Sequence, residues 1–174
     1  MAEVRDVVQL GDPVLREVAR PIADFEDEGM QRLIDELMVT LRQSNGVGIA
    51  APQVAVPYRL LIVASRPNAR YPHAPEMEPT VMLNPRWEAV TEERVKDWEG
   101  CLSVPGIRGL VPRYREIRVE YCDRTGHLQQ QVLTDFVARI FQHEFDHLEG
   151  LVFLDRVESS QELMSEQEYL KRVV

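Results

Sequence analysis

Apolar residues recur at helical spacing in the segment from Glu28 to Ser44. The recurring positions are Met30, Leu33, Ile34, Leu37, Met38 and Leu41. Because 3.6 residues complete one turn, these side chains share one face of a helix. The pattern predicts an amphipathic helix in the N-terminal part of the chain.

A second helical pattern lies near the C-terminal end. Phe136, Ile140, His143 and His147 are spaced 4, 3 and 4 residues apart. This spacing predicts an inward-facing stripe on one helix, so both histidines point towards the protein interior. Either Thr134 or Asp135 is suited to cap the start of this helix, and Gly150 is suited to end it.

Strand patterns fill much of the remaining sequence. Residues 116–121 alternate between charged and apolar side chains, which predicts a half-buried strand. A turn at 123–126 then leads into a hairpin partner at 127–133. Residues 59–64 predict a buried strand, and residues 81–91 predict another with a break at Asn84-Pro85. A short strand is expected at 152–154, and a terminal helix at 161–172.

Length and composition describe one acidic globular domain. The 174 residues predict a single domain, 1–174, in which residues 155–174 form a C-terminal tail with a helix. The net charge of -9 disfavours nucleic acid as a partner. The apolar run at 60–64 is too short to span a membrane, and the first residues lack the features of a secretory signal. Two cysteines are too few for a disulfide framework, so we expect a cytoplasmic protein.

Residues 143–147 read His-Glu-Phe-Asp-His, which is an H-E-x-x-H motif. On a helix, four residues advance about 6 Å, so His143 and His147 lie one above the other and can bind one metal ion. Glu144 is rotated by about 100° and can border the ion without binding it. This geometry suits a metal-activated water beside a proton-transferring carboxylate, and it predicts hydrolysis. A solvated histidine pair is the alternative, which the apolar neighbours disfavour.

The fold class follows from these elements taken together. We expect an α+β protein, with mostly antiparallel sheets wrapped around a central metal-bearing helix. An N-terminal amphipathic helix and a C-terminal helix complete it.

Two histidines require a third protein ligand, which leaves a fourth position for water. His73 lies in the proline-rich loop at 66–79 and His127 at a hairpin turn, so both are expected at the surface. Cys122 lies on a predicted strand and is expected to be an ordinary buried cysteine. Cys101 follows Gly100, which allows another backbone to come close. We therefore favour Cys101 as the third ligand over a cysteine that is merely buried in a turn.

The glycine-rich stretch at 45–53 has two interpretations. A phosphate-binding loop is disfavoured, because no Lys-Ser/Thr ending follows and no strand leads into it. Small residues here can instead let a substrate backbone approach, while the neutral amide of Gln53 suits an oxyanion hole. The alternative is a tight loop with a structural glutamine.

Three segments together resemble the peptide deformylase family. The family pattern is G-x-G-x-A-A-x-Q, then E-G-C-L-S, then Q-H-E-x-D-H-L-x-G. The matching residues are Gly46, Gly48, Ala50, Ala51 and Gln53; Glu99, Gly100, Cys101, Leu102 and Ser103; Gln142, His143, Glu144, Asp146, His147, Leu148 and Gly150. The resemblance covers about residues 5 to 157.

The resemblance implies an enzyme that removes the formyl group from N-terminal formylmethionine of nascent proteins, releasing formate. It implies that Cys101, His143 and His147 hold the metal. Glu144 would be the general acid and base, and Gln53 with the backbone N–H of Leu102 would bind the oxyanion. The substrate contacts are expected at Val47, Gly48, Gly100, Arg108, Phe136 and Ile140. An extended peptide would pair with residues 47–48 and with the backbone near 106–108.

Ligand chemistry alone would favour zinc. The resemblance instead implies one Fe2+ per chain, which Zn2+, Ni2+ or Co2+ can replace. It also implies N-formylmethionyl peptides of nascent chains as partners and transient proximity to the ribosome, and we expect a monomer. Acidic residues outnumber Lys171 and Arg172 in the tail, so docking through a basic C-terminal helix is disfavoured.

Two other functions remain as alternatives. A zinc endopeptidase would need a downstream ligand, but no histidine follows His147. A metal-binding module without turnover would not need Glu144 or Gln53.

Asp135 stands where many deformylases carry glycine, and we expect it to cap the helix.

Overall fold

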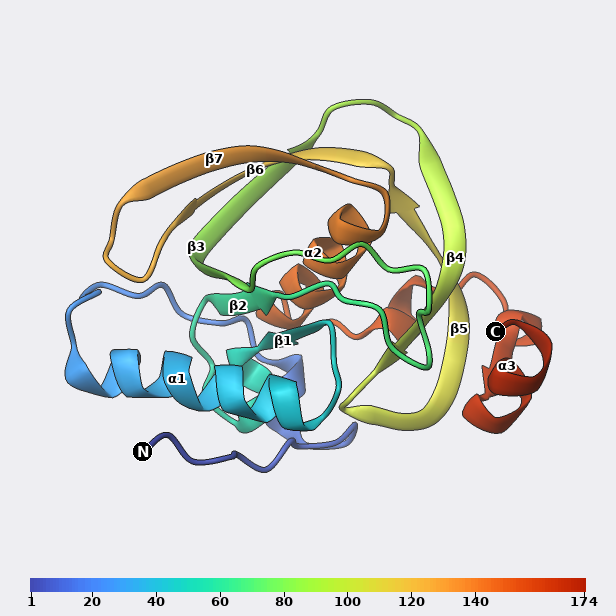
Figure 1. Cartoon of the computed structure of the whole chain (residues 1–174), viewed down its shortest axis with the longest axis horizontal. Helices are drawn as coiled ribbons and strands as arrows, with labels where there is room; N and C mark the ends of the chain where they lie inside the picture. Colours follow the sequence, from blue (N-terminus) through green and yellow to red (C-terminus); the bar gives the residue numbers. More distant parts are fainter.

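The computed structural model describes residues 1–174 and has an α+β architecture (Figure 1). The α-helices are α1 (Glu28–Gln43), α2 (Asp135–Leu148) and α3 (Glu166–Arg172). The strands are β1 (Gly48–Ala50), β2 (Leu60–Val63), β3 (Thr80–Ala89), β4 (Arg94–Cys101), β5 (Val104–Tyr114), β6 (Glu116–Cys122), β7 (Leu128–Thr134) and β8 (Leu163–Ser165). Short 3-10 helices are η1 (Pro13–Arg16), η2 (Ala51–Val54), η3 (Phe153–Arg156) and η4 (Ser160–Glu162).

Two antiparallel sheets surround α2. One has the order β1-β2-β3-β6-β7, and the other has the order β4-β5-β8. Helix α2 contacts strands of both sheets, and Figure 1 shows it within their curve. The prediction of an α+β fold with antiparallel sheets is confirmed. No helix is long and apolar enough to cross a membrane.

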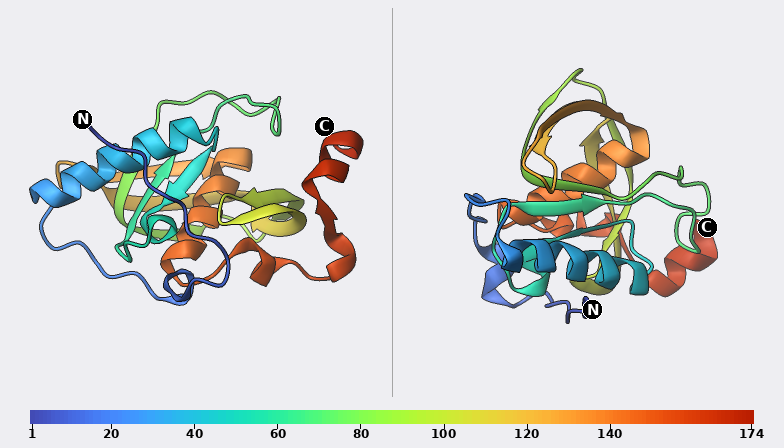
Figure 2. Two further views of the ribbon diagram at one scale, coloured as in Figure 1. Left: turned by 90° about the horizontal axis from the view of Figure 1, so that it is seen from below. Right: turned by 60° about the vertical axis from the view of Figure 1, so that its left-hand side comes forward.

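Strand β2 is apolar throughout because both of its faces are covered. Leu61 and Val63 belong to the core around α2, whereas Leu60 and Ile62 belong to the core under α1. Alternate side chains of a strand point to opposite faces, so one short strand contributes to both cores. The sheet is therefore a layer between the two long helices, as Figure 2 shows from other directions.

Helix α1 begins where the sequence predicts. The Asp27 side chain accepts a hydrogen bond from the Met30 backbone at 2.8 Å, which satisfies a free N–H of the first turn. The buried face includes the fully buried Ile34 and Leu37. Burial of one such side chain contributes about 1.5–3 kcal/mol, so this face holds the helix on the sheet.

The predicted break in β3 is confirmed. Asn84 has a φ of 49°, and the pairing register between β3 and β6 shifts between Leu83 and Arg86. The Asn84 side chain donates to the Ile22 carbonyl at 2.9 Å and accepts from the Ile22 N–H at 2.8 Å. These bonds tie the N-terminal segment to the sheet.

The predicted ends of the chain are wrong in two places. Residues 153–156 form the 3-10 helix η3 rather than a strand, because the Asp155 carboxylate accepts from the Val152 N–H at 2.8 Å and turns the backbone. The terminal helix begins at Glu166, five residues later than predicted. Residues 163–165 instead pair with β5 as strand β8, which supplies their backbone hydrogen bonds.

The start of α2 also differs from the prediction. Thr134 occupies the N-cap but makes no side-chain hydrogen bond to the helix, and Asp135 has a φ of 52°. The Asp135 carboxylate pairs with Arg115 at 2.9 Å instead of capping the helix. Gly150 ends the helix as predicted, with a φ of 74° that favours glycine.

Candidate active site and metal centre

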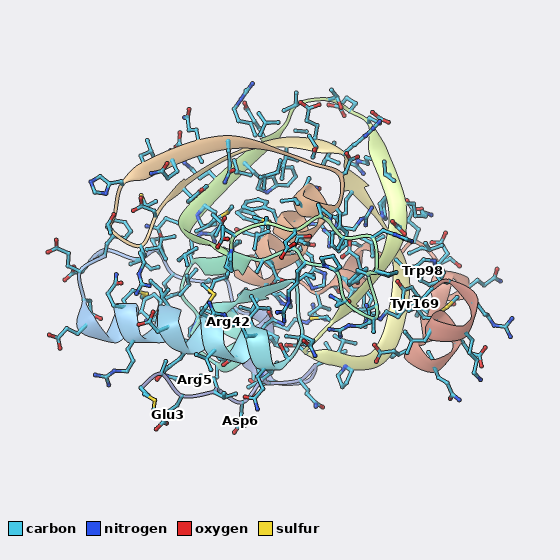
Figure 3. All side chains as sticks on the ribbon, viewed as in Figure 1. Glu3, Arg5, Asp6, Arg42, Trp98 and Tyr169 are labelled. Atoms are coloured by element: carbon cyan, nitrogen blue, oxygen red, sulfur yellow. The ribbon has the colours of Figure 1, made fainter.

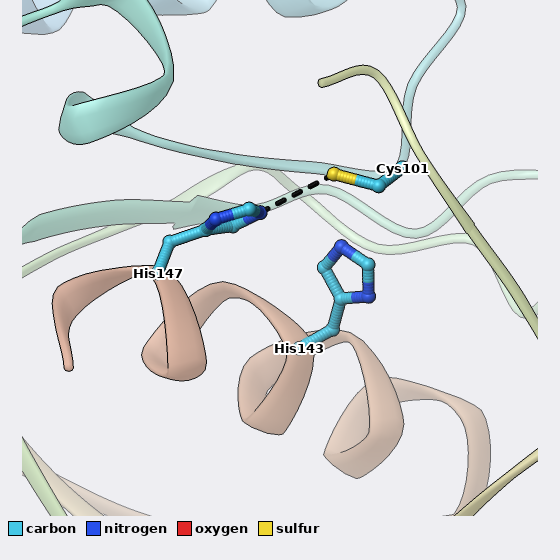
Figure 4. A group of neighbouring side chains, drawn as sticks. All are labelled: Cys101, His143 and His147. Atoms are coloured by element: carbon cyan, nitrogen blue, oxygen red, sulfur yellow. Dashed lines mark hydrogen bonds between the residues drawn. The ribbon is translucent and has the colours of Figure 1, made fainter. Parts of the chain in front are cut away.

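Two histidines and a cysteine converge at the centre of the molecule. His143 and His147 lie on one face of α2 with ring centroids 5.4 Å apart. The Cys101 Sγ atom, at the end of β4, lies 3.4 Å from His147 Nε2. Figure 4 shows the thiol and both rings facing a common space. One donor atom from each residue lies within 4.8 Å of the others.

These donors fit a four-coordinate metal ion with one position left open. Sulfur and nitrogen ligands of a tetrahedral ion are about 3.6 Å apart at ordinary bond lengths. The separation of Cys101 and His147 matches that value closely. Burial lowers the pKa of His147 well below its ordinary value, which keeps its imidazole neutral and able to bind metal.

Glu99 orients the other histidine. His143 Nδ1 is 2.8 Å from the Glu99 carboxylate, so Nε2 is the ring nitrogen that remains for an ion. Burial would lower the pKa of His143, but hydrogen bonds to Cys101 and Glu99 raise it well above its ordinary value. A divalent ion bound to His143 would replace the proton that this imidazole shares with Cys101.

A buried charge cluster holds Glu99 in turn. Arg113 donates two hydrogen bonds to the Glu99 carboxylate, each at 2.9 Å, and Arg139 donates a third at 2.7 Å. Arg113 also donates to Asp146 of α2 at 2.6 Å. Burial alone would raise the pKa of Glu99, but Arg113 and His143 lower it below its usual range. The cluster therefore joins β4, β5 and α2 around the candidate metal ligands.

Glu144 lies beside the ligands and is 4% exposed. Its Oε2 atom has no hydrogen-bond partner within the protein. Burial raises the pKa of Glu144 to about 7, although His143 opposes the shift. A carboxylate with this pKa can both accept and release a proton near neutral pH.

Gln53 is positioned next to the cysteine. Its side-chain oxygen accepts from the Ala50 N–H at 2.9 Å. This bond directs the amide nitrogen to Ser103 Oγ at 3.2 Å and to Cys101 Sγ at 3.6 Å. The backbone N–H of Leu102 donates no hydrogen bond within the protein. The Gln53 amide therefore reaches Cys101, and the Leu102 N–H has no partner within the protein.

One cavity brings the predicted site residues together. Every one of them except His147 lines it, and the predicted residues in its wall are Val47, Gly48, Gln53, Gly100, Cys101, Leu102, Arg108, Phe136, Ile140, His143 and Glu144. His147 is fully buried behind the cavity. His73 and His127 are exposed, as expected for surface residues, and Cys122 is half-buried on β6 rather than fully buried.

The backbone edges at the cavity bear on the expected binding of an extended peptide. Strand β1 lies at the end of its sheet, so one of its edges has no partner strand. Residues Ile107 to Gly109, by contrast, are already paired with β8. Strand β8 therefore occupies one edge of β5 at these residues, and the expected pairing of a peptide near residues 106–108 stays a prediction. Gly100 lies at a register shift between β4 and β5.

Arg108 is bound by residues from both sides of the cavity. Its guanidinium donates to Tyr71 Oη at 2.9 Å and to Glu166 of α3 at 2.8 Å. It also lies 5.1 Å from the ring centroid of Tyr169. An added Cβ at Gly100 would lie 2.3 Å from this guanidinium, so glycine is required beneath it. Arg108 therefore connects the proline-rich loop to the C-terminal helix at the cavity wall.

Sequence reasoning missed several of these residues. No role was assigned to Glu99 or Asp146, and Tyr71, Arg113 and Arg139 were not identified at all. Arg139 carried a signal, because it is a charged residue four positions before His143 on the inward face of a helix. Tyr71 and Arg113 carried none, since only tertiary structure places them at the site.

Fold and site together define a metal-dependent hydrolase of the H-E-x-x-H type, in which a cysteine is available as a third donor. Comparisons with known proteins are consistent with that class. A family model described as polypeptide deformylase matches residues 4–163. A peptide deformylase from Nostoc sp. is 61% identical over 98% of this chain and 96% of its own length.

Solved structures agree with the sequence relatives. A Met-Ala-Ser-bound class I type b peptide deformylase from Acinetobacter baumannii matches with a TM-score of 0.87 and 43% identity, covering 90% of this chain and all of its own. A peptide deformylase from Synechococcus elongatus, in complex with actinonin, matches with a TM-score of 0.80 and 34% identity, covering 97% of this chain and 85% of its own. The chain belongs to the polypeptide deformylase family. It is a hydrolase that removes the N-formyl group from newly synthesised peptides.

Proposed function

We propose that deformylation takes place at the cavity beside Cys101, His143 and His147, which together bind one divalent metal ion. The observation that carries this proposal is the convergence of a thiol and two imidazoles next to the buried Glu144 carboxylate. When bound, the ion supplies Lewis acidity, which activates water and polarises the formyl carbonyl. The endopeptidase alternative is disfavoured, because the third donor is Cys101 rather than a residue after His147.

Glu144 acts as the proton carrier in this proposal. It takes a proton from the attacking water and gives it to the amine that leaves as the amide bond breaks. Its pKa, raised to about 7 by burial, supports both steps. The oxygen of the formyl group becomes negatively charged in the transition state, and the Gln53 amide and the Leu102 N–H donate hydrogen bonds to it.

The substrate is an extended peptide that begins with formylmethionine. The free edge of β1 at Gly48 supports pairing with the peptide backbone on one side. Gly100 offers a second close approach on the other side. Val47, Phe136 and Ile140 supply apolar walls for the methionine side chain. The Met-Ala-Ser bound by the Acinetobacter baumannii protein supports a ligand of this kind.

Ferrous iron is the ion that we propose for the native enzyme, with Zn2+, Ni2+ or Co2+ as substitutes. The donor set of one sulfur and two nitrogens suits all of these ions, so the choice rests on the family resemblance. Metal analysis of protein purified without oxygen tests it. A preparation that contains zinc alone, and gains no activity when apoprotein is loaded with Fe2+, would contradict the proposal.

Formate release from formyl-Met-Ala-Ser tests the activity itself. We expect turnover by the metal-loaded protein, none after chelation, and recovery when a divalent ion is restored. Acetyl-Met-Ala-Ser is the matched control, because its larger acyl group tests selectivity for formyl. Cleavage inside an unformylated peptide would instead indicate an endopeptidase.

The contacts of the C-terminal tail support the proposal that α3 does not dock to the ribosome, and we also propose that the protein is a monomer. Glu166 and Tyr169 of α3 bind Arg108 at the cavity wall, and Tyr169 packs edge-on against Trp98 (Figure 3). Because of these contacts, α3 packs against the rest of its own chain rather than projecting from it. Sedimentation of the protein alone, and with ribosomes, tests both proposals.

A further inference from the structure

The N-terminal segment makes a backbone hydrogen bond to each of the three segments that form the site. The Val8 N–H donates to the Gln53 carbonyl at 2.9 Å, and the Leu10 N–H donates to the Ser103 carbonyl at 2.8 Å. Further along, the Ala19 N–H donates to the carbonyl of Leu148 at 2.9 Å. Figure 2 (left) shows this dark blue segment crossing the molecule from α1.

The segment is anchored firmly at both ends. Arg5 forms an ion pair with Glu36 of α1 at 2.6 Å, and its N–H donates to Thr40 Oγ1 at 2.9 Å. Figure 3 shows Arg5 beside α1. At the other end, the Leu15 side chain is 1% exposed in the core. Residues 7–11 are therefore held between two fixed points, although they form no regular element.

The two carbonyls that accept these bonds belong to opposite sides of the cavity. Gln53 follows β1 in the five-stranded sheet, whereas Ser103 lies at the β4–β5 turn of the other sheet. No backbone hydrogen bond joins residues 45–54 directly to residues 99–105. Their direct polar link is the Gln53 side chain, which reaches Ser103 and Cys101. The N-terminal segment is therefore the backbone connection between the two sides.

We propose that Val8 and Leu10 are positioning residues for the deformylase reaction. Their N–H groups hold the backbones of Gln53 and Ser103 at one separation, and thereby set the distance between the Gln53 amide and the Leu102 N–H. Oxyanion donors are effective only when they are fixed before the charge develops. This inference rests on the proposed roles of Gln53 and Leu102.

Proline substitutions test the inference, because proline has no N–H to donate. Val8→Pro and Leu10→Pro each remove one of the two bonds. Val7→Pro and Gln9→Pro are matched controls, since the N–H groups of Val7 and Gln9 donate no hydrogen bond within the protein. We expect Val8→Pro and Leu10→Pro to lower kcat by about 10- to 100-fold, the loss typical of a small misplacement. KM and metal content should stay near wild type, and the controls should retain kcat.

A double-mutant cycle separates positioning from general stability. Val8 acts through Gln53, so Val8→Pro should lower kcat little further in a Gln53→Ala background. Leu10→Pro acts through the Ser103 segment, so its effect should persist in that background. The inference would be overturned if Val8→Pro lowered kcat by the same factor in the wild-type and Gln53→Ala backgrounds. It would also be overturned if Gln9→Pro lowered kcat as much as Val8→Pro does.

The outcomes also distinguish the inference from the site assignment beneath it. An unchanged kcat in Gln53→Ala would refute the oxyanion role of Gln53. A lowered kcat in Gln53→Ala with a normal kcat in Val8→Pro would refute the positioning role alone. If Val8→Pro does not fold, Arg5→Ala releases the anchor on α1 with the backbone intact. Arg5→Ala should lower kcat in the wild-type background and should not change kcat in the Gln53→Ala background. Any other result counts against the positioning role.

Discussion

Glu144 occupies the space that a side chain at Gly48 would need. A Cβ atom built on Gly48 would lie 2.7 Å from Glu144 Oε1 and 2.7 Å from Ile140 Cγ2. Both distances are shorter than non-bonded contacts of real Cβ atoms. The glycine of β1 therefore allows the carboxylate to lie beside the metal ligands.

Gly48→Ala should displace Glu144 and lower kcat by about 10² to 10⁴, the usual contribution of general acid–base catalysis. Metal content should not change, because Glu144 is not among the proposed ligands. Adding Ile140→Ala relieves only the second contact, so the loss should persist in the double variant. Steady-state kinetics with metal analysis checks this, and full activity in Gly48→Ala would contradict the steric argument.

Glu144→Gln keeps the size of the side chain but cannot carry the proton. We expect kcat to fall by about 10² to 10⁴ while the ion remains bound. Metal analysis and formate release should be measured on one preparation. Loss of the ion would make Glu144 a ligand instead, and a rate close to wild type would remove its assigned role.

Cys101→Ser should lower metal retention and activity together, because a neutral hydroxyl is a poorer ligand than a thiolate. Cys122→Ser is the matched control, since Cys122 lies on β6 outside the cavity and should retain both properties. Dialysis against a chelator, followed by metal analysis, measures retention. If Cys101→Ser keeps the ion as well as the control does, the third ligand lies elsewhere.

Gln53 has a structural role as well as the proposed catalytic one. Gln53→Ala should lower kcat by about 10² to 10³, the usual loss for one oxyanion donor, with little change in KM. It also leaves the buried Ala50 N–H without its partner, which costs about 1–3 kcal/mol of stability. Gln53→Glu keeps an acceptor for that N–H but loses the amide donor, so kcat should stay low in this variant too. A normal kcat in either variant would argue against the oxyanion role.

Asp135→Gly should stabilise the protein slightly without changing activity. A non-glycine residue at a φ of 52° carries about 1 kcal/mol of strain, although aspartate tolerates this region better than most residues. Loss of the pair with Arg115 offsets little of this, because solvent screens an exposed ion pair. Thermal melts of Asp135→Gly and of Arg115→Ala separate the two effects. Clear destabilisation by Asp135→Gly, beyond that of Arg115→Ala, would contradict the strain argument.

Local patterns were enough to predict much of the fold. The apolar spacing predicts α1, and the alternation with the turn that follows it predicts the β6–β7 hairpin. The i,i+4 spacing placed His143 and His147 on one face of α2, as the structure bears out. These features depend on neighbours within a few residues, so the periodicity of the sequence contains them.

The β4–β5–β8 sheet was not predicted. Strand β4 exposes Val95 and Lys96 and shows no clean alternation, so its sequence carries little strand signal. Its hydrogen bonds come from β5, and those of β8 come from β5 across more than fifty residues. Pairing at that distance overrode the helical pattern at residues 161–165.

The sequence alone determined the family and the chemical groups of the site, because the three motifs contain, in order, the residues proposed to bind metal and to carry the proton. It could not determine how those groups are held. The contact of Glu99 with Arg113, Arg139 and His143 joins three elements, and Arg113 and Arg139 look like ordinary charged residues in the sequence. Buried charges are stable only when partners surround them, and packing of the two sheets on α2 brings those partners together. Tertiary structure therefore decided the orientation of the ligands, the connection of Val8 and Leu10 to the site, and the need for glycine beside Glu144.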